Sequence, residues 1–454
     1  MTPKPDHRAT YLAFKNASSG PLIVERPALF SPAAAAQDAG TGKTAVGRFG
    51  PLYLPLEYTD WAEEGQAHVN SCYIGDWTPL SKTRVSGPQA LEFLSQLGMN
   101  DLSKFEIGQV KHHVQLDENA WIASEGILLR IDDGEFVYTA GSGDWLVWQL
   151  SQREWAASAE DISPDLFIFG VQGPESLAVV SAATGDDLTD IRFNRSRVTQ
   201  LNGVAVRVLR TGISGELGYE VHGPAEHADE IWSALVEAGA PYGIKKLGFR
   251  AQSIQHIESG IATNGLDYMP SSAITPGAAW QFKRSYPGGS FVAESFTDYF
   301  RRPTELGWGG RGALTHKFIG RDALVAEAEA GGPRRIHVGL TWNSDDVLDV
   351  FASYFRDGDL PEPMELPKVQ GPVFDQVRVD GEPVGVSTGR TLSVVLRRTI
   401  SLAVIDRAHA APGTRVTVLW GRPGTAQREI RAEVTELPFK PDHRRVDVQA
   451  MEHA

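Results

Sequence analysis

The chain contains very little cysteine and no long apolar run. Cys72 is the only cysteine among 454 residues, which excludes an internal disulfide framework and a cysteine-based zinc site. No run of 18 apolar residues occurs, and the opening MTPKPDHR lacks the apolar segment of a secretory signal. We therefore expect a cytoplasmic protein with no membrane partner.

Positive charge is also scarce. Lysine and arginine number 43 against 57 aspartate and glutamate residues, so the net charge is −14. Nucleic-acid phosphates require a basic face, so this balance argues against a nucleic-acid partner. The apolar fraction of 42% is typical of a globular protein, and the length exceeds one ordinary hydrophobic core, so two or three domains are expected.

Composition and pattern divide the chain into three parts. Residues 1–50 are rich in alanine, glycine and proline, which favours an arm over the surface of the following domain. Residues 51–334 alternate strand and helix patterns, and residues 335–454 are rich in valine and glycine with short strands. The last part is typical of a small antiparallel β-barrel.

The middle part contains the same order of elements twice. A strand, a helix, several strands and another helix are predicted from about residue 83 to 153, and again from 167 to 238. The segment 227–238 is a clearly amphipathic helix. The sequence thus predicts an α+β fold in which two similar halves face each other across a cleft.

The most informative segment is TGISGELGYE at 211–220. Glycines at 212, 215 and 218 allow a loop to approach a planar ligand, and Glu220 stands at the start of the following strand. A carboxylate in that position can accept paired N–H donors from a pterin ring. The alternative is an ordinary β-turn, which uses the same residues.

The glycine-rich loop alone does not identify a protein family, but it occurs together with other informative segments. They are IASEGILL near 122, LGFRAQSIQHIESG at 247–260, TPGAAW at 275–280, FIGRDAL at 318–324 and VGVSTGR at 384–390. In this order the chain, from about residue 50 to 425, resembles the aminomethyltransferase of the glycine cleavage system and its relatives, the tetrahydrofolate-dependent demethylases. WNSDDV at 342–347 and the insert after it look more similar to the aryl ether O-demethylases.

This resemblance implies a three-domain fold, tetrahydrofolate as cofactor and a small aromatic substrate. The implied reaction passes a methyl or methylene group from an aromatic ether to tetrahydrofolate and releases a phenol or catechol. Two alternatives stay open. One is an amine or sulfonium substrate in the same fold, and the other is a folate-binding protein without turnover.

The resemblance also implies site residues. Glu220, with Tyr219 beside it, matches the pterin anchor, and Glu125 stands where the family usually has an aspartate near the reactive nitrogens, so we expect it to be catalytic. The matching cofactor-binding positions along the cleft are Arg250, His113, Tyr138 and Thr139.

The sequence departs from the O-demethylases at two positions. Pro79 and Gln252 stand in the regions where that family has a histidine and a tyrosine as proton donors. Expelling a phenolate from an unactivated ether is slow without a positioned acid. We therefore predict that Cys72 is the donor, since the reference pKa of a thiol, about 8.5, lies closer to that of a phenol than the pKa of serine does. The alternatives are His68, Tyr58 and Tyr73.

Aromatic residues predict the walls of the substrate pocket. Trp61, His68 and Trp77 are the expected substrate contacts, since a flat ring would stack on indole. Further tryptophans lie beside the motif segments, at positions 121, 145, 148, 280 and 308. No metal-binding pattern is visible. Assembly into a homo-oligomer, with the arm exchanged between copies, stays open.

Overall fold

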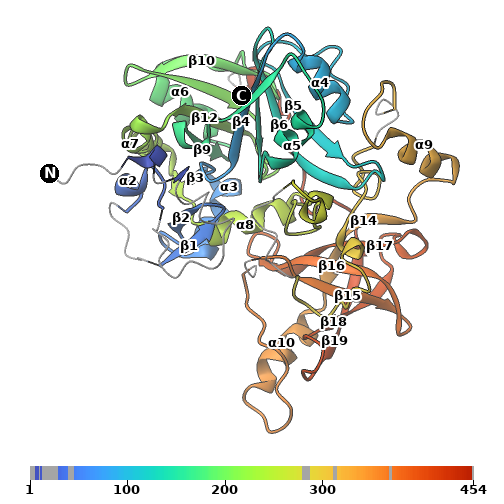
Figure 1. The fold of residues 1–454 in the computed structure, drawn as a ribbon. Helices are drawn as coiled ribbons and strands as arrows, with labels where there is room; N and C mark the ends of the chain where they lie inside the picture. Colours follow the sequence, from blue (N-terminus) through green and yellow to red (C-terminus); the bar gives the residue numbers. More distant parts are fainter. Residues whose placement is uncertain are drawn as a thin grey trace.

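The computed structural model describes residues 6–9, 11–12, 29–38, 45–278, 287–309, 314–367 and 371–451. Two mixed α/β halves and a closed barrel surround a central helix (Figure 1). The prediction of an α+β fold with two similar halves and a C-terminal antiparallel barrel is confirmed.

The first half is built on a five-stranded antiparallel sheet with two helices on one face. The helices are α4 (Ala90–Leu97) and α5 (Asp144–Ser151), and their apolar residues pack on Leu128, Phe136 and Tyr138 of the sheet. The strand order is β5 (Val110–Leu116), β6 (Ile122–Asp132), β7 (Glu135–Ala140), β4 (Ser81–Ser86) and β8 (Ser158–Asp161).

The second half repeats this arrangement. Its helices α6 (Ser176–Thr184) and α7 (Ala228–Gly239) cover one face, and a parallel strand adds a sixth position at the edge. The strand order is β10 (Ser196–Leu201), β11 (Val204–Arg210), β12 (Gly218–Pro224), β9 (Leu166–Gln172), β3 (Tyr73–Asp76) and β13 (Lys245–Lys246).

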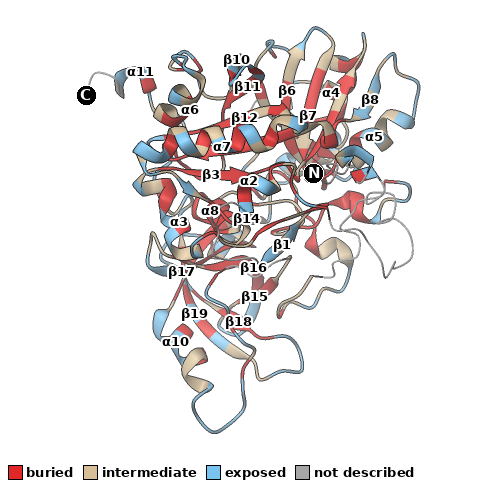
Figure 2. Cartoon of the chain, turned by 90° about the vertical axis from the view of Figure 1, so that its left-hand side faces the viewer, coloured by how far each residue is buried: buried red, intermediate tan, exposed pale blue. Residues whose placement is uncertain are grey.

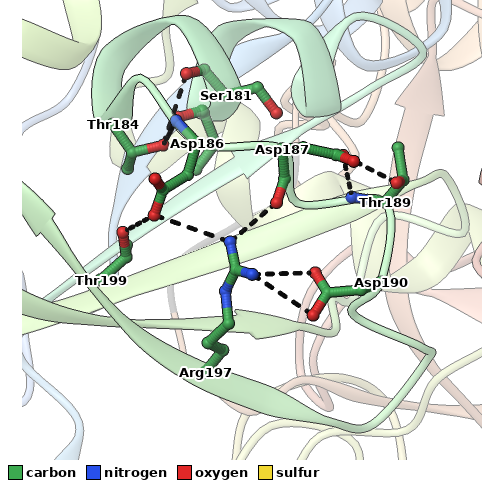
Figure 3. A network of polar contacts seen from close by, with 9 residues as sticks. Ser181, Thr184, Asp186, Asp187, Thr189, Asp190, Arg197 and Thr199 are labelled. Carbon is green, nitrogen blue, oxygen red and sulfur yellow. Dashed lines mark hydrogen bonds and ion pairs between the residues drawn. The ribbon is translucent and has the colours of Figure 1, made fainter.

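Strand β10 is fixed at its outer edge by charge. Arg197 donates from Nη2 to the carbonyl of Asp187 at 2.7 Å, and it forms an ion pair with Asp190 at 3.3 Å (Figure 3). Thr199 donates to the carboxylate of Asp186 in the same cluster. The Asp186 and Asp190 carboxylates are about half exposed, so we expect these ion pairs to set the register of the edge more than to add stability.

The barrel closes on itself through six antiparallel strands. From it project α10 (Ser344–Ser353) and the loop that follows, at the bottom of Figure 1. The helix α9 (Arg321–Glu329) precedes the barrel. The strand order is β14 (Arg335–Trp342), β17 (Arg398–Asp406), β16 (Glu382–Ser393), β15 (Phe374–Val379), β18 (Arg415–Trp420) and β19 (Arg428–Thr435).

Helix α8 (Phe249–Glu258) lies where the halves and the barrel meet (Figure 1). Its last residue, Glu258, accepts a hydrogen bond from Ser393 of the barrel at 2.6 Å. The other oxygen of Glu258 lies 3.1 Å from Nε2 of His68 in α3 (Trp61–Asn70). One buried carboxylate therefore ties three parts of the molecule together.

Described segments near both ends of the chain pack on the second half. The helix α2 (Ala34–Asp38) packs on α7, and Gln37 donates to Asp76 at 2.6 Å. The hairpin of β1 (Val46–Phe49) and β2 (Leu52–Pro55) follows it. Near the other end, Val446 and Val448, the latter at the start of α11 (Val448–Met451), join the core of that half. Figure 2 shows the buried residues concentrated in the sheets and in α8.

Candidate functional site

The two sheets contact each other on the faces that their helices leave free. Leu209 of β11 packs against Val110 and Leu129 of the first sheet, and all three are buried. Paired residues of neighbouring strands point to the same side of a sheet, and side chains alternate along each strand. This contact therefore defines the inner face of each sheet, and every strand residue can be assigned to the inner or the helix-covered face.

Glu125 lies on the inner face of the first sheet, two positions from Ile127 and four from Leu129 along β6. Its Oε2 is 2.8 Å from Nε2 of His112 on the neighbouring strand. The carboxylate is mostly buried, with 18% of the side chain exposed, whereas His112 is 40% exposed. The pair therefore combines a shielded carboxylate with a ring that solvent can reach.

Aromatic rings border this pair. The ring of Trp308 stands edge-on to His112, with 4.9 Å between centroids, and Tyr268 stands edge-on to Trp308 at 6.1 Å. Burial, and next the charge of Glu125, raise the pKa of Tyr268 well above its usual value. The carboxylate thus has an apolar, aromatic neighbourhood on one side.

Glu220 lies on the inner face of the second sheet, because it pairs with Leu209. Its Oε2 is 2.9 Å from Nε2 of His222, and both side chains are mostly buried. The other oxygen of Glu220 has no hydrogen-bond partner within the described part of the chain. The two inner faces therefore carry the same arrangement, a glutamate bonded to a histidine.

Two buried polar groups lie near Glu220, Nε2 of Gln172 and the hydroxyl of Tyr73. Nε2 of Gln172 has no hydrogen-bond partner among the residues described, whereas the Tyr73 hydroxyl interacts with the side chain of Ser214. Gln172 pairs with Gly218 across the strands, and Tyr73 pairs with Gln172, so both lie on the face of Glu220. A buried donor without a partner costs free energy. Gln172 therefore marks a place where a polar ligand would be accommodated.

The glycine-rich loop passes directly over Gln172. A Cβ at Gly212 or Gly218 would come within 2.7 Å of this side chain, so neither position accepts a larger residue without movement. Gly215 adopts a φ of +77°, which favours glycine. The prediction that these glycines serve a close approach agrees with the geometry, although the nearest neighbour is a side chain of the protein.

Residues near the C-terminus fix the position of this loop. Glu216 of the loop binds Nζ of Lys440 at 2.5 Å and Nδ1 of His443 at 2.7 Å. The backbone N–H of His443 also donates to the carbonyl of Gly215 at 2.7 Å. The loop is therefore fixed by residues more than 200 positions away in the sequence.

Two expected site residues lie on the helix-covered face of the second sheet. Tyr219 precedes Glu220 on β12, so its ring points the opposite way, into the core beneath α6 and α7. Burial raises the pKa of its hydroxyl to about 12. Alternation along the strand thus separates the Tyr-Glu pair, and Tyr219 does not share the inner face with Glu220.

The structure does not place Cys72, the predicted proton donor, on the inner face with Glu220. Its thiol is completely buried in the same core, beside Ile74 and beneath the helices. Burial, and next the charge of Glu175, raise the thiol pKa to about 12. The side chain faces away from Glu220, and such a thiol is a poorer acid than the phenol it would have to protonate.

The expected cofactor residues of the first sheet divide between its two faces. Thr139 pairs with Ile127 and lies on the inner face with Glu125. His113 and Tyr138 lie on the helix-covered face, where His113 Nε2 contacts the carbonyl of Leu94 at 2.9 Å. Burial lowers the pKa of His113 to about 4, so its ring is neutral. The hydroxyl of Tyr138 is bonded to Ser124 at 2.8 Å. The structure gives both residues a packing role.

The remaining polar candidates lie at the ends of α8 and α3. Arg250 forms a 3.1 Å ion pair with Glu57, and its side chain is 35% exposed. His68, expected to contact substrate, is completely buried against Glu258. Tyr58 belongs to the core beneath α7, stacked on Trp232. None of these three is bonded to Glu125 or Glu220 within the described residues.

Trp61 and Trp77 come together in one apolar cluster with Tyr73. Trp77 lies over Gly75 and Gly170 of the inner face, and its ring is stacked on Tyr73 with 6.2 Å between centroids. An added Cβ at Gly75 would lie 2.1 Å from the indole. These aromatic residues thus form part of the wall beside Glu220, while Trp280 lies outside the described residues.

The histidines that pair with the two glutamates were missed in the sequence. Both were visible through strand alternation. His222 is two positions after Glu220 in GYEVHG, so the two side chains share a face. In VKHHVQL only one of the adjacent histidines can face inward; the prediction named His113, whereas His112 is the one on the inner face.

Other kinds of site are less well supported. Within the described residues, no group of three or more His, Cys, Asp and Glu side chains is placed to hold a metal ion. No helix in the described part is long and apolar enough to cross a membrane. A cavity of about 270 Å³ beside Ser259 and His337 and a hollow of about 880 Å³ on the barrel surface are not lined by Glu125 or Glu220. The site is therefore assigned from the paired carboxylates.

This architecture is shared with known proteins. Residues 37–279 match the GCVT N-terminal domain, and residues 365–440 match the glycine cleavage T-protein C-terminal barrel domain. Over 90% of the chain and 97% of the other, the fold is similar to the crystal structure of glycine cleavage system aminomethyltransferase T from Bartonella henselae, with a TM-score of 0.69 and 20% identity.

Relatives of known activity cover most of the sequence. The chain is 38% identical to a sesamin methylene transferase from a Sinomonas species, over 85% of this chain and 90% of the relative. It is 31% identical to a syringate O-demethylase from a Sphingobium species, over the same shares. An aminomethyltransferase from Saccharopolyspora erythraea is 26% identical over 85% of this chain and 91% of its own length. The chain therefore belongs to the glycine cleavage T-protein family.

Proposed function

We propose that this protein is an enzyme that transfers a one-carbon group from an aromatic ether to tetrahydrofolate and releases a phenol or catechol. The observation that carries the proposal is the pair of glutamate–histidine contacts on facing sheets, Glu125–His112 and Glu220–His222. The names of the two relatives above 30% identity, a methylene transferase and an O-demethylase, support the same chemistry.

The inner face of the second sheet fits a pterin. In the described part, one carboxylate oxygen of Glu220 and the buried Nε2 of Gln172 have no hydrogen-bond partner, and the Tyr73 hydroxyl lies on the same face. A pterin has N–H donors for the carboxylate and acceptors for the other two groups. When bound, tetrahydrofolate supplies a nucleophilic amine. Glu220 would orient the ring, and the aromatic rings of Trp77 and Tyr73 would exclude water from it.

Glu125 would act on the facing side. Its carboxylate is shielded, bonded to His112 and bordered by aromatic rings, so it is suited to hold or accept a proton during the transfer. Trp308, on the same side, offers an indole edge to a flat aromatic substrate. We expect catalysis to come from orientation and from proton transfer by this pair.

The direct test is incubation with tetrahydrofolate and a panel of methoxy and methylenedioxy aromatics. Mass spectrometry of the folate product decides between two outcomes, 5-methyltetrahydrofolate from a methyl ether and 5,10-methylenetetrahydrofolate from a methylenedioxy ring. A parallel incubation with dimethylglycine and dimethylsulfoniopropionate covers amine and sulfonium donors. Folate methylation from those donors alone would contradict the proposal.

A further inference from the structure

Cys72, the donor predicted from the sequence, is buried on the helix-covered face of the second sheet, and the inner faces contain a better placed acid. We propose that His112 is the catalytic acid for this step and that Glu125 is its partner. This inference rests on the proposed function, because it concerns the leaving oxygen of the same aromatic ether.

The geometry of His112 carries the proposal. Its Nε2 is 2.8 Å from the Glu125 carboxylate, and Nδ1 has no hydrogen-bond partner among the residues described. The side chain is 40% exposed on the inner face, so a substrate oxygen can approach the free nitrogen. In its protonated form the ring donates one N–H to Glu125 and offers the second to a ligand.

The surroundings position the ring for an aromatic substrate. Trp308 packs edge-on against His112 and limits its rotation, with the two ring planes at 86°. The charged group that contacts the ring is the Glu125 carboxylate on β6, while His113, next to His112 on β5, points to the opposite face. A flat substrate that packs on Trp308 would therefore bring an ether oxygen toward Nδ1.

Protons balance in this scheme. As the C–N bond forms, the Glu125 carboxylate accepts the proton lost at the attacking amine. As the C–O bond breaks, Nδ1–H of His112 protonates the departing aryl oxygen, which leaves as a phenol. The pair has then become a neutral carboxylic acid and a neutral imidazole. Loss of one proton from Glu125 to water and uptake of one at the exposed His112 ring restore the starting state.

The kinetic test varies the leaving group. Single-turnover rates are measured for wild type and His112→Gln with aryl methyl ethers whose phenols span a range of acidity. We expect a loss of about 10²-fold or more for an unactivated ether and less than about tenfold for a nitro-substituted one, which needs no acid. An equal loss for both ethers, or no loss, would overturn the assignment. His112→Ala with added imidazole should recover activity on the unactivated ether if His112 is the acid.

A matched control is a histidine on the helix-covered side of the second half, away from the inner faces. His227, the N-cap residue of α7, also contacts a glutamate, Glu230, at 3.5 Å, and its side chain is 41% exposed. His227→Gln should retain wild-type rates on both ethers. If it lost activity in the same leaving-group-dependent way as His112→Gln, the assignment would be wrong.

A binding measurement separates this inference from the proposed function. Absorbance titration with 4-nitrophenol, without folate, reports whether His112 touches the phenolic oxygen. We expect His112→Gln to bind the ionised phenol at least about tenfold more weakly than wild type, and to bind 4-nitroanisole equally well. Equal phenol binding would overturn the role of His112. Failure of wild type to transfer carbon from any ether would overturn the proposed function, whatever the binding result.

Discussion

Lys440 and Glu216, 224 positions apart in the sequence, form an ion pair of 2.5 Å with both side chains buried. Glu216 belongs to the glycine-rich loop over the inner face, and Lys440 follows the barrel. The conformation of the loop at the proposed folate site therefore depends on Lys440, a residue near the end of the sequence that is not expected to contact the ligand.

Removing one partner of this pair should destabilise the protein. Lys440→Met leaves a buried carboxylate with His443 alone, and we expect a loss of about 3 kcal/mol in the free energy of unfolding. Lys245→Met, at the exposed pair with Glu63, should cost about 1 kcal/mol or less. Denaturant titration measures both. A Lys440→Met/Glu216→Gln double variant should be more stable than Lys440→Met, and the reverse order would show that the pair is not coupled.

Glu220→Gln should weaken tetrahydrofolate binding by about 2–3 kcal/mol, because charge-assisted hydrogen bonds to the pterin are lost. Calorimetry measures the affinity directly. Glu226→Gln, on the exposed side of the same half, is the control and should bind as wild type does. Unchanged affinity in Glu220→Gln would remove the assignment of the pterin anchor.

Glu125→Gln keeps the shape of the side chain and removes its charge. Turnover should fall by about 10²-fold while the affinity for tetrahydrofolate stays within a few-fold of wild type. Comparing single-turnover rates with calorimetric affinities checks this. If turnover and affinity fell together, Glu125 would be a binding residue.

Cys72→Ala should leave turnover close to wild type and lower the free energy of unfolding by about 1–2 kcal/mol, since only packing is removed. The native thiol should also resist iodoacetamide at pH 8, because burial raises its pKa to about 12. Mass spectrometry of the alkylated protein, with and without denaturant, measures this. Rapid alkylation of the folded enzyme, or loss of the chemical step in Cys72→Ala, would restore the catalytic hypothesis.

His113 should make stability depend on pH. Burial lowers its pKa to about 4 in the folded state, whereas the unfolded chain binds the proton near pH 6.5. Between these values the unfolded state binds more protons, so stability is lost on acidification from pH 6.5 toward 4. His113→Gln lacks this contribution. The stability advantage of wild type over the variant should shrink by about 2–3 kcal/mol between pH 7 and 4.5 in denaturant titrations.

Local patterns in the sequence predicted the architecture, and the family resemblance pointed to the two inner-face glutamates. The repeated order of elements predicts the halves, and the glycine loop precedes Glu220 directly. Cys72 and Tyr219 were misplaced because each stands beside an inner-face residue, and alternation sends it to the opposite side of the sheet. Which side carries the helices depends on pairing between distant strands. The contact of Lys440 with Glu216 depends on the same long-range assembly, and no local pattern predicts it.

Strand β3 lies in the interior of the second sheet, between β9 and β13, yet the whole first sheet follows it in the sequence before β9 appears. On the ribosome, residues 73–76 therefore emerge well before either of their neighbours, with a delay on the order of ten seconds at usual elongation rates. The intervening sheet is complete by then and can fold first. A cut or a fusion placed between β3 and β4 would detach an interior strand from its own sheet, so the two halves are not interchangeable modules despite their shared strand order.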